Sequence, residues 1–285
     1  MFFFLDRTYS EYIAPAVLLA EQLKCSINNV TCFRLRSTEE IITAQSAVDS
    51  KFTSLNPLLF FEPWLPVIDN DIIHGSILNI SDTSFPWKSL AIGTVTDECL
   101  DFVYSRWQKV LTPSEYIVLM VGLYVEKAGK VLEKYPPEGE GDQRDLVVRG
   151  CTQWVFVCPT RAFARKGALY YYAYGYPSNG ERFSNRITCR GHACHGDELP
   201  IVFEANWGNL TDADRRMSQH VATYWTNFAK SQNPNEPFNV SLSWPKMNST
   251  TNEPYMFLQD PLQIEENYLK SDCDFWDQIG YKMLF

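Results

Sequence analysis

Apolar side chains along residues 212–231 recur at the spacing of one face of a helix. The stripe consists of Met217, Val221, Tyr224, Trp225 and Phe228. An amphipathic helix is therefore predicted over this range. Residues 11–45 also have a helical pattern, which is interrupted between Cys25 and Cys32. Ser37, with Glu40 three residues later, marks the start of the helix that follows the interruption.

Two further helices are predicted in the middle of the chain. The segment Thr112-Pro113-Ser114-Glu115 has the pattern of a capping box with proline at the first helical position, so a helix is expected from there to about Leu132. Residues 158–166 are also predicted to be helical. Residues 136–142 are rich in proline, glycine and acidic side chains, which makes them the best candidate for an internal linker.

Two short apolar runs predict buried strands, at residues 89–94 and 168–174. Thr96-Asp97-Glu98 follows the first run, and an irregular polar loop over residues 175–200 follows the second. Helices separated by isolated buried strands indicate an α/β fold. Two core strands are fewer than a sheet usually has, so we expect part of the sheet to be missing from this sequence.

Composition narrows the class of protein. The chain has 285 residues, of which 45% are hydrophobic and 21% charged, as in ordinary globular proteins. Its net charge of −9 and its lack of a basic block argue against nucleic acid or an anionic membrane surface as a partner. The longest apolar run, residues 116–125, is also shorter than the roughly 20 residues that a membrane-spanning helix needs.

Two features predict a secreted protein or one of the secretory pathway. The chain has eight cysteines, which suit an oxidising compartment. It also has five Asn-x-Ser/Thr sequons, at Asn29, Asn79, Asn209, Asn239 and Asn248, which are candidate glycosylation sites. The first residues lack the basic and long apolar regions of a signal peptide, so we expect that peptide to lie upstream of this sequence.

The densest chemical cluster is residues 189–198. It contains Cys189, His192, Cys194 and His195 and ends in acidic residues. A histidine in a loop after a buried strand can serve as the general base of an α/β hydrolase. Alternatively, the segment is a surface loop closed by a Cys189–Cys194 disulfide. A metal site is the third interpretation, but in an oxidising compartment the two thiols would pair with each other.

Asp97 and Glu98 form the second candidate site. A carboxylate at the end of a strand can orient an imidazole, fix its tautomer and stabilise the imidazolium during acyl transfer. Acidic residues after a strand are more often simply solvated. The order of acid first and His195 later in the chain gives this position weight as a catalytic pair.

Nine segments of the chain occur in the order found in one family. They are Leu23-Lys24-Cys25 with Cys32-Phe33-Arg34-Leu35, Phe61-Glu62-Pro63-Trp64-Leu65-Pro66-Val67-Ile68-Asp69, Ile92-Gly93-Thr94-Val95-Thr96-Asp97-Glu98, Phe156-Val157-Cys158-Pro159-Thr160-Arg161, His195-Gly196-Asp197-Glu198-Leu199-Pro200, Trp225-Thr226-Asn227-Phe228-Ala229, Asn233-Pro234-Asn235, Trp244-Pro245 and Cys273-Asp274-Phe275-Trp276. From about Leu18 to Phe285 the chain resembles the C-terminal half of a type-B carboxylesterase, the family that includes the cholinesterases.

This resemblance implies a fold and a set of site residues. The fold would be the C-terminal portion of an α/β hydrolase, with few strands flanked by helices, and residues 1–285 would form one partial domain. Glu98 would be the triad acid and His195 the general base of a serine esterase that acts on a small carboxylic ester without a cofactor. The resemblance also implies disulfides Cys25–Cys32 and Cys158–Cys273. The Cys189–Cys194 pairing follows from their spacing, and Cys99 and Cys151 are the remaining two cysteines.

The chain departs from the family in one respect. None of its 14 glycines belongs to a Gly-x-Ser-x-Gly nucleophile motif, and no Gly-rich oxyanion segment is present. Cys194, Ser178 and Ser76 lack the setting of a substitute nucleophile. We therefore expect the serine and the N-terminal half of the fold upstream, and this chain alone to be inactive.

Three hypotheses remain open. The chain is a fragment of a serine esterase, a non-catalytic binding or adhesion module, or one part of a two-chain enzyme that associates with its N-terminal half. Choline, lipid and simple aliphatic esters are equally compatible substrates. Trp64, Trp87 and Phe203 are expected to pack in the core rather than line a substrate gorge.

Overall fold

The computed structural model describes residues 9–55, 64, 66–76, 78, 88–167, 169–177, 186–204, 210–247 and 252–281. The chain divides into two compact units, one of residues 4–79 and one of residues 80–285 with residues 1–3. The boundary therefore does not fall at the predicted linker, residues 136–142. That loop is fixed within the second unit by the buried side chain of Gln143, which accepts from the N–H of Glu138 and donates to the carbonyls of Glu138 and Gly141.

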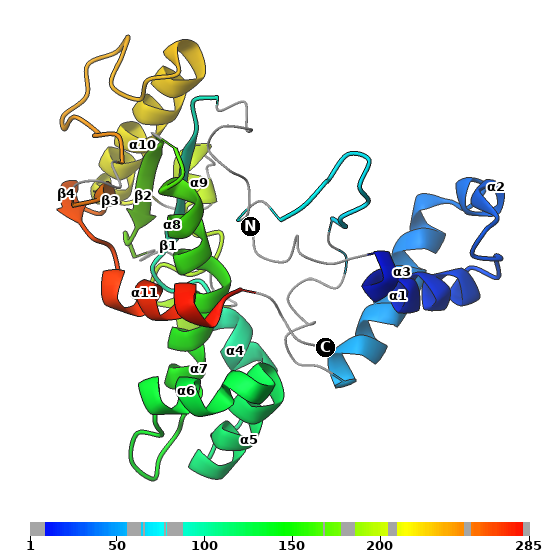
Figure 1. The fold of residues 1–285 in the computed structure, drawn as a ribbon. Helices are drawn as coiled ribbons and strands as arrows, with labels where there is room; N and C mark the ends of the chain where they lie inside the picture. Colours follow the sequence, from blue (N-terminus) through cyan, green and yellow to red (C-terminus); the bar gives the residue numbers. More distant parts are fainter. Residues whose placement is uncertain are drawn as a thin grey trace. The chain divides into compact units, whose positions relative to one another are not determined.

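Among the described residues of the first unit are the helices α1 (Tyr9–Gln22), α2 (Val30–Arg34) and α3 (Thr38–Leu55) (Figure 1). The predicted interruption is confirmed, and a Cys25–Cys32 disulfide closes it. Ser37 and Glu40 form the predicted reciprocal cap, because each side chain accepts the backbone N–H of the other. The helix continues ten residues beyond the predicted end at position 45.

A four-stranded sheet organises the second unit, in the order β1-β2-β3-β4 (Figure 1). Its strands are β1 (Ala91–Val95), β2 (Tyr170–Tyr174), β3 (Pro254–Leu258) and β4 (Gln263–Glu266). The first three strands are parallel, and β4 runs antiparallel to β3. The sequence predicted β1 and β2, and β3 and β4 were not found from it. Gly93 lets β1 approach β2 closely, since a Cβ there would lie 2.2 Å from the carbonyl oxygen of Tyr172.

Helices lie on both faces of this sheet. The helical elements described in this unit are α4 (Leu100–Arg106), α5 (Pro113–Tyr124), a 3₁₀ turn (Val125–Lys127), α6 (Ala128–Lys134), α7 (Arg144–Cys151), a π-helical segment (Thr152–Val157), α8 (Cys158–Ala164), a 3₁₀ turn (Ile187–Cys189), α9 (Leu199–Val202), α10 (Asp212–Ser231) and α11 (Lys270–Ile279). The segment predicted as a helix from 158 thus belongs to a longer helical run that begins at Arg144.

The predicted capping box at Thr112 is present, with the side chains of Thr112 and Glu115 bonded reciprocally. The helix that it opens ends early, at Tyr124, because the backbone turns at Val125 (φ 46°). Tertiary contacts hold this turn. The Tyr124 ring packs on Trp154 and Trp276, with ring centroids 5.1 and 5.5 Å away, and the Lys127 ammonium donates to the carbonyl of Ile279.

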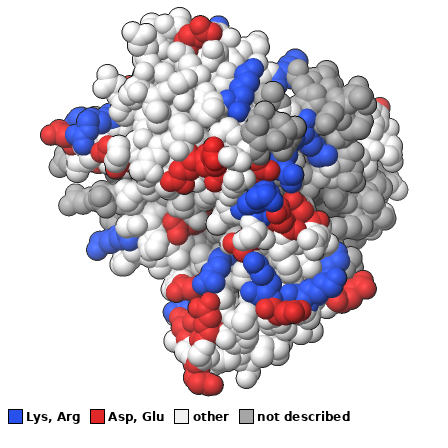
Figure 2. Space-filling model, turned by 60° about the vertical axis from the view of Figure 1, so that its left-hand side comes forward, with Lys and Arg blue, Asp and Glu red and all other residues white. Residues whose placement is uncertain are grey.

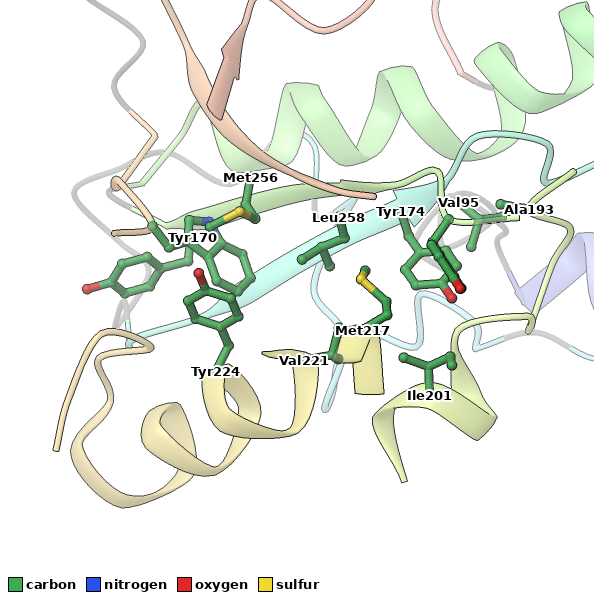
Figure 3. Close-up of a cluster of buried hydrophobic side chains, with 12 residues drawn as sticks. Val95, Tyr170, Tyr174, Ala193, Ile201, Met217, Val221, Tyr224, Met256 and Leu258 are labelled. Atoms are coloured by element: carbon green, nitrogen blue, oxygen red, sulfur yellow. The ribbon is translucent and has the colours of Figure 1, made fainter. Parts of the chain in front are cut away.

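One face of the sheet rests on α9 and α10 (Figure 3). Met217, Val221 and Tyr224 project from α10 toward the strands, as the apolar stripe predicted. The buried cluster between them consists of Val95, Tyr170, Tyr174, Tyr176, Ala193, Ile201, Met217, Val221, Tyr224, Trp244, Met256 and Leu258. Burial of each larger apolar side chain contributes about 1.5–3 kcal/mol. Ala193 belongs to the predicted polar loop, so this core also anchors the loop that carries His195.

On the face shown in Figure 2, acidic and basic side chains lie interspersed rather than in separate patches. Some ion pairs of the second unit are exposed, such as Arg216 with Asp260 at 3.1 Å. A different pair lies inside the second unit: Arg161 Nε donates to Glu253 Oε2 at 2.7 Å, and the two side chains are 0% and 4% exposed. Arg161 follows the disulfide-bonded Cys158 closely in α8, and its pair with Glu253 ties α8 to the segment just before β3.

Candidate active site

Glu98 and His195 come from the carboxyl ends of two neighbouring strands. Glu98 lies in the turn that follows β1, and His195 lies in the loop that follows β2. Because β1 and β2 are parallel, their carboxyl ends meet at one edge of the sheet, where α/β proteins usually bind ligands. Backbone hydrogen bonds extend the pairing beyond the strands, since Asp97 N–H donates to the carbonyl of Ala193 at 3.0 Å.

The two side chains form an acid–imidazole pair. Nδ1 of His195 lies 2.5 Å from Oε2 of Glu98. The other carboxylate oxygen, Oε1, accepts the backbone N–H of Val95 at 3.0 Å, which fixes the orientation of the acid. Glu98 is buried at 5% exposure, whereas the side chain of His195 is 35% exposed. No described residue hydrogen-bonds to Nε2 of His195, so that nitrogen can meet a reacting group.

Two phenyl rings flank this imidazole. The ring centroids of Phe102 and Phe156 lie 5.3 and 5.4 Å from that of His195. Burial acts to lower the pKa of His195, but the hydrogen bond and charge of Glu98, together with the charge of Glu198, outweigh it and raise the pKa above the ordinary 6.5. Burial also raises the pKa of Glu198, and the nearby charge of Glu98 adds to this rise.

The loop before His195 is held by several contacts. A disulfide joins Cys189 to Cys194, five residues apart, immediately before the histidine. Oδ2 of Asp197 accepts the backbone N–H of Cys194 at 2.9 Å. Arg186 contacts both Asp197 and the carbonyl of His195. Sequence reasoning did not find Arg186, because no motif links an arginine to a loop nine residues later. Asp197 was part of the segment that carries the family resemblance, but no role was predicted for it.

Asp97, which the sequence grouped with Glu98, turns to a different partner. Its Oδ1 lies 3.2 Å from Nδ1 of His192, and its Oδ2 accepts the N–H of Ala193 at 3.2 Å. Asp97 and His192 line a cavity of about 740 Å³ whose other polar walls include Tyr104, Asp145 and Tyr268. Glu98 and His195 are not among the lining residues of this cavity. The adjacent carboxylates of Asp97 and Glu98 therefore contact two different histidines, His192 and His195.

The structure pairs the cysteines as Cys25–Cys32, Cys99–Cys151, Cys158–Cys273 and Cys189–Cys194. The sulfurs of Cys189 and Cys194 are thus joined to each other and do not serve as thiolate metal ligands or as nucleophiles. The second pairing, which the sequence left as the remainder, fixes Cys99, the residue after Glu98. Each residue of the acid–imidazole pair therefore has a disulfide-bonded cysteine beside it.

Among the other predicted residues, Asn29 and Asn239 are exposed. Oδ1 of Asn29 also caps α2 by accepting the N–H of Cys32. Asn79, Asn209, Asn248, Ser178 and Trp87 lie outside the described residues. Ser76 is buried, and its hydroxyl accepts the N–H of Leu78.

Phe203 does not pack in the core as expected, since it is 74% exposed. It lies at the end of the short helix α9, beyond the reach of the hydrophobic cluster. Trp64 is half-buried and donates from Nε1 to Oδ1 of Asp49 at 2.6 Å.

In the part of the chain that the structure describes, no helix is long and apolar enough to cross a bilayer.

Comparison with known proteins agrees with this geometry. The chain is 29% identical over 274 residues to the cAMP-regulated D2 protein of Dictyostelium discoideum, a match that covers 92% of this chain and 51% of that protein. It is 25% identical over 306 residues to acetylcholinesterase of Bungarus fasciatus, covering 97% of this chain and 49% of the enzyme. The chain thus spans about half the length of these relatives.

The fold matches that of a solved structure titled PNB esterase, with a TM-score of 0.70 at 18% identity. The match covers 95% of this chain and 55% of that one, so the mixed sheet and its helices are part of an α/β-hydrolase fold. The model of the carboxylesterase family matches residues 12–276. The chain belongs to the carboxylesterase family.

Proposed function

We propose that this chain supplies the acid and the base of a serine-type carboxylic ester hydrolase. One observation carries the proposal: Nδ1 of His195 lies 2.5 Å from a buried carboxylate, Glu98, at the carboxyl edge of a parallel sheet. In acyl transfer, a carboxylate in this position holds the imidazole in the tautomer whose Nε2 accepts a proton. It then stabilises the imidazolium that forms.

The reaction would proceed through an acyl-enzyme. The serine oxygen attacks the ester carbonyl carbon while Nε2 of His195 takes the hydroxyl proton. The tetrahedral intermediate then breaks its bond to the alcohol oxygen, which leaves with that proton. Water repeats the sequence, so that the acyl group leaves as a carboxylic acid and the serine is restored. Glu98 stays ionised throughout.

The serine would come from outside these 285 residues, since no Gly-x-Ser-x-Gly motif occurs among them. The edge of the sheet supports this part of the proposal. β1 stands at the end of the strand order, so its outer backbone groups are not paired by any strand that the structure describes. A further parallel strand added there would end beside Glu98 and His195, at the same edge of the sheet.

The same proposal places the protein in the secretory pathway. Four disulfides suit an oxidising compartment, and the exposed amides of Asn29 and Asn239 suit N-linked glycans. Treatment of the secreted protein with an amidase that releases N-glycans should lower its mass and convert each glycosylated asparagine to aspartate. An unmodified Asn29 and Asn239 in secreted material would contradict this part.

The function is tested on the complete protein that contains this chain, isolated by a tag at its C-terminus. A fluorophosphonate probe should label a serine outside residues 1–285, and the protein should hydrolyse p-nitrophenyl acetate. Glu98→Gln and His195→Ala should each lower kcat by about 10³-fold or more. His220→Ala on α10, whose Nδ1 contacts the hydroxyl of Ser241, is the matched histidine control and should retain activity.

A non-catalytic binding module is the second candidate, favoured by the absence of the nucleophile motif from the printed sequence. It predicts a complete protein that neither reacts with the probe nor hydrolyses esters. Full activity of the 285-residue chain by itself, with the label inside it, would instead overturn the external serine.

A further inference from the structure

The side chain of Arg186 connects the two strand ends that carry the acid and the base. Its Nε donates to Oδ2 of Asp101 at 3.0 Å, in the first turn of α4, which begins two residues after Glu98. Its two terminal nitrogens each lie 3.3 Å from the backbone carbonyl oxygen of His195. One guanidinium therefore contacts the helix after the acid and the peptide of the base.

The same guanidinium also contacts the fully buried Asp197. Nη1 of Arg186 lies 3.2 Å from Oδ1 of Asp197, whose side chain is 0% exposed. A buried carboxylate needs a cation or several hydrogen-bond donors to offset its desolvation. Here the donors include Arg186 and the N–H of Cys194, which Oδ2 accepts. Asp197, two residues after His195, is thus tied to the arginine directly, and Cys194, just before His195, is tied to it through Asp197.

The chemistry of the contact favours arginine over lysine. The guanidinium presents donors in a rigid planar fork, so it can engage Asp101, Asp197 and a carbonyl at once. An ammonium is a point charge on a flexible stem and cannot hold three acceptors from two elements in fixed positions. Arg186 is 24% exposed, so these contacts are partly removed from water.

We infer that Arg186 is a positioning residue, which fixes the distance between His195 and Glu98 by tying the base-bearing loop to α4. This inference rests on the roles proposed above for Glu98 and His195. Arg186 touches neither imidazole nor carboxylate of that pair and acts through the backbone of His195. A displacement of about 1 Å in a catalytic group can cost about 10²-fold in rate, which gives such a tie its importance.

The competing explanation is that Arg186 only neutralises the charge of Asp197 and has no effect on the imidazole of His195. The two roles differ in what they predict for His195 itself. Loss of a positioning contact loosens the Nδ1–Glu98 hydrogen bond even in a protein that remains folded. Loss of a merely structural contact lowers stability and leaves that hydrogen bond as it was.

The test uses the 285-residue chain with ¹⁵N-labelled histidine. NMR measures the pKa of His195 and the exchange rate of its Nδ1 proton in the wild type, Arg186→Met, Arg186→Lys and Asp101→Asn. Arg186→Met should lower the pKa of His195 and speed Nδ1 proton exchange by about tenfold or more, since both reflect the contact with Glu98. Arg186→Lys should restore little. Arg190→Met, an exposed arginine of the same loop, is the matched control and should leave both values unchanged.

Asp101→Asn covers the case in which Arg186→Met fails to fold, because it weakens the tie to α4 by removing the charge of Asp101 and keeps the Arg186–Asp197 pair. It should shift His195 in the same direction by a smaller amount. Wild-type values of the pKa and exchange rate in a folded Arg186→Met, or in a folded Asp101→Asn where the first variant is unfolded, would overturn the inference.

The complete protein provides a second readout. There, Arg186→Met should lower kcat by about 10- to 100-fold with little change in KM, because Arg186 acts through the backbone of His195. The two proposals fail separately. A wild-type protein without ester hydrolysis overturns the proposed function and leaves the NMR result to decide the role of Arg186. Unchanged NMR values overturn the positioning role even where ester hydrolysis is present.

Discussion

Glu98 and His195 are 97 positions apart in the chain, yet Oε2 of the acid lies 2.5 Å from Nδ1 of the imidazole. Two parallel strands bring them together, and the backbone N–H of Val95 orients the acid from behind. The arrangement has consequences that can be measured in the chain itself, without any substrate.

The first prediction concerns the pH dependence of stability. Because the folded-state pKa of His195 is raised, the folded protein binds this proton more tightly than the unfolded chain does. The stabilisation is present below the ordinary pKa of 6.5, provided that Glu98 is ionised, and is lost as the pH rises through the folded-state value. Glu98→Gln should therefore lower the urea midpoint more at about pH 6 than at about pH 9. A midpoint difference that does not vary with pH contradicts this.

A second prediction concerns the buried ion pair of Arg161 and Glu253. Glu253→Ala leaves the guanidinium, which is 0% exposed, without its main carboxylate, and should cost about 3–5 kcal/mol of unfolding free energy. The exposed pair of Arg216 and Asp260 supplies the control. Asp260→Ala should cost less than about 1 kcal/mol. The unfolding free energies are measured by urea unfolding. Equal losses of unfolding free energy in the two variants would show that burial does not determine how much an ion pair contributes to stability.

A third prediction compares two glycines. Gly93→Ala would place a Cβ 2.2 Å from the carbonyl oxygen of Tyr172, so β1 and β2 must separate, at a cost of about 1–3 kcal/mol. Gly122 lies in α5 with nothing within 4 Å of an added Cβ. Gly122→Ala should stabilise the protein by about 0.5–1 kcal/mol through helix propensity. Thermal unfolding of both variants checks the opposite signs.

A fourth prediction separates the disulfides by the loops that they close. Cys158–Cys273 spans 115 positions, and its replacement by two alanines should cost about 5 kcal/mol by the chain-entropy relation. Cys189–Cys194 spans only 5 positions, and the same relation gives about 2 kcal/mol. The short bridge should instead alter proton exchange at the adjacent His195. A loss of stability that is greater for the short bridge would refute this ranking.

The sequence predicted those elements whose conformation is specified by residues close to one another along the chain. The stripe from Met217 to Phe228 and the box of Thr112 and Glu115 lie within a few residues of one another, so each specifies its helix without the rest of the chain. The family resemblance predicted the roles of Glu98 and His195, and the structure brings the two side chains into contact.

Features that depend on distant residues were missed. The break at Val125 has no local signal, because the contacts of Tyr124 and Lys127 with distant helical segments hold it. β4 is a short polar segment with mostly exposed side chains, and pairing with β3 makes it a strand. The contacts of Arg186 with Asp101 join residues 85 positions apart and follow no periodic pattern.

The placement of Glu98 and His195 on neighbouring parallel strands also determines when their relative freedom is lost. Both come from the same compact unit, so the entropy of orienting acid toward base is lost during folding of that unit rather than during assembly with a nucleophile. Under the proposed function, a serine from outside the chain would meet a pair that is already oriented. Only the translational and rotational freedom of the serine would then be lost on assembly.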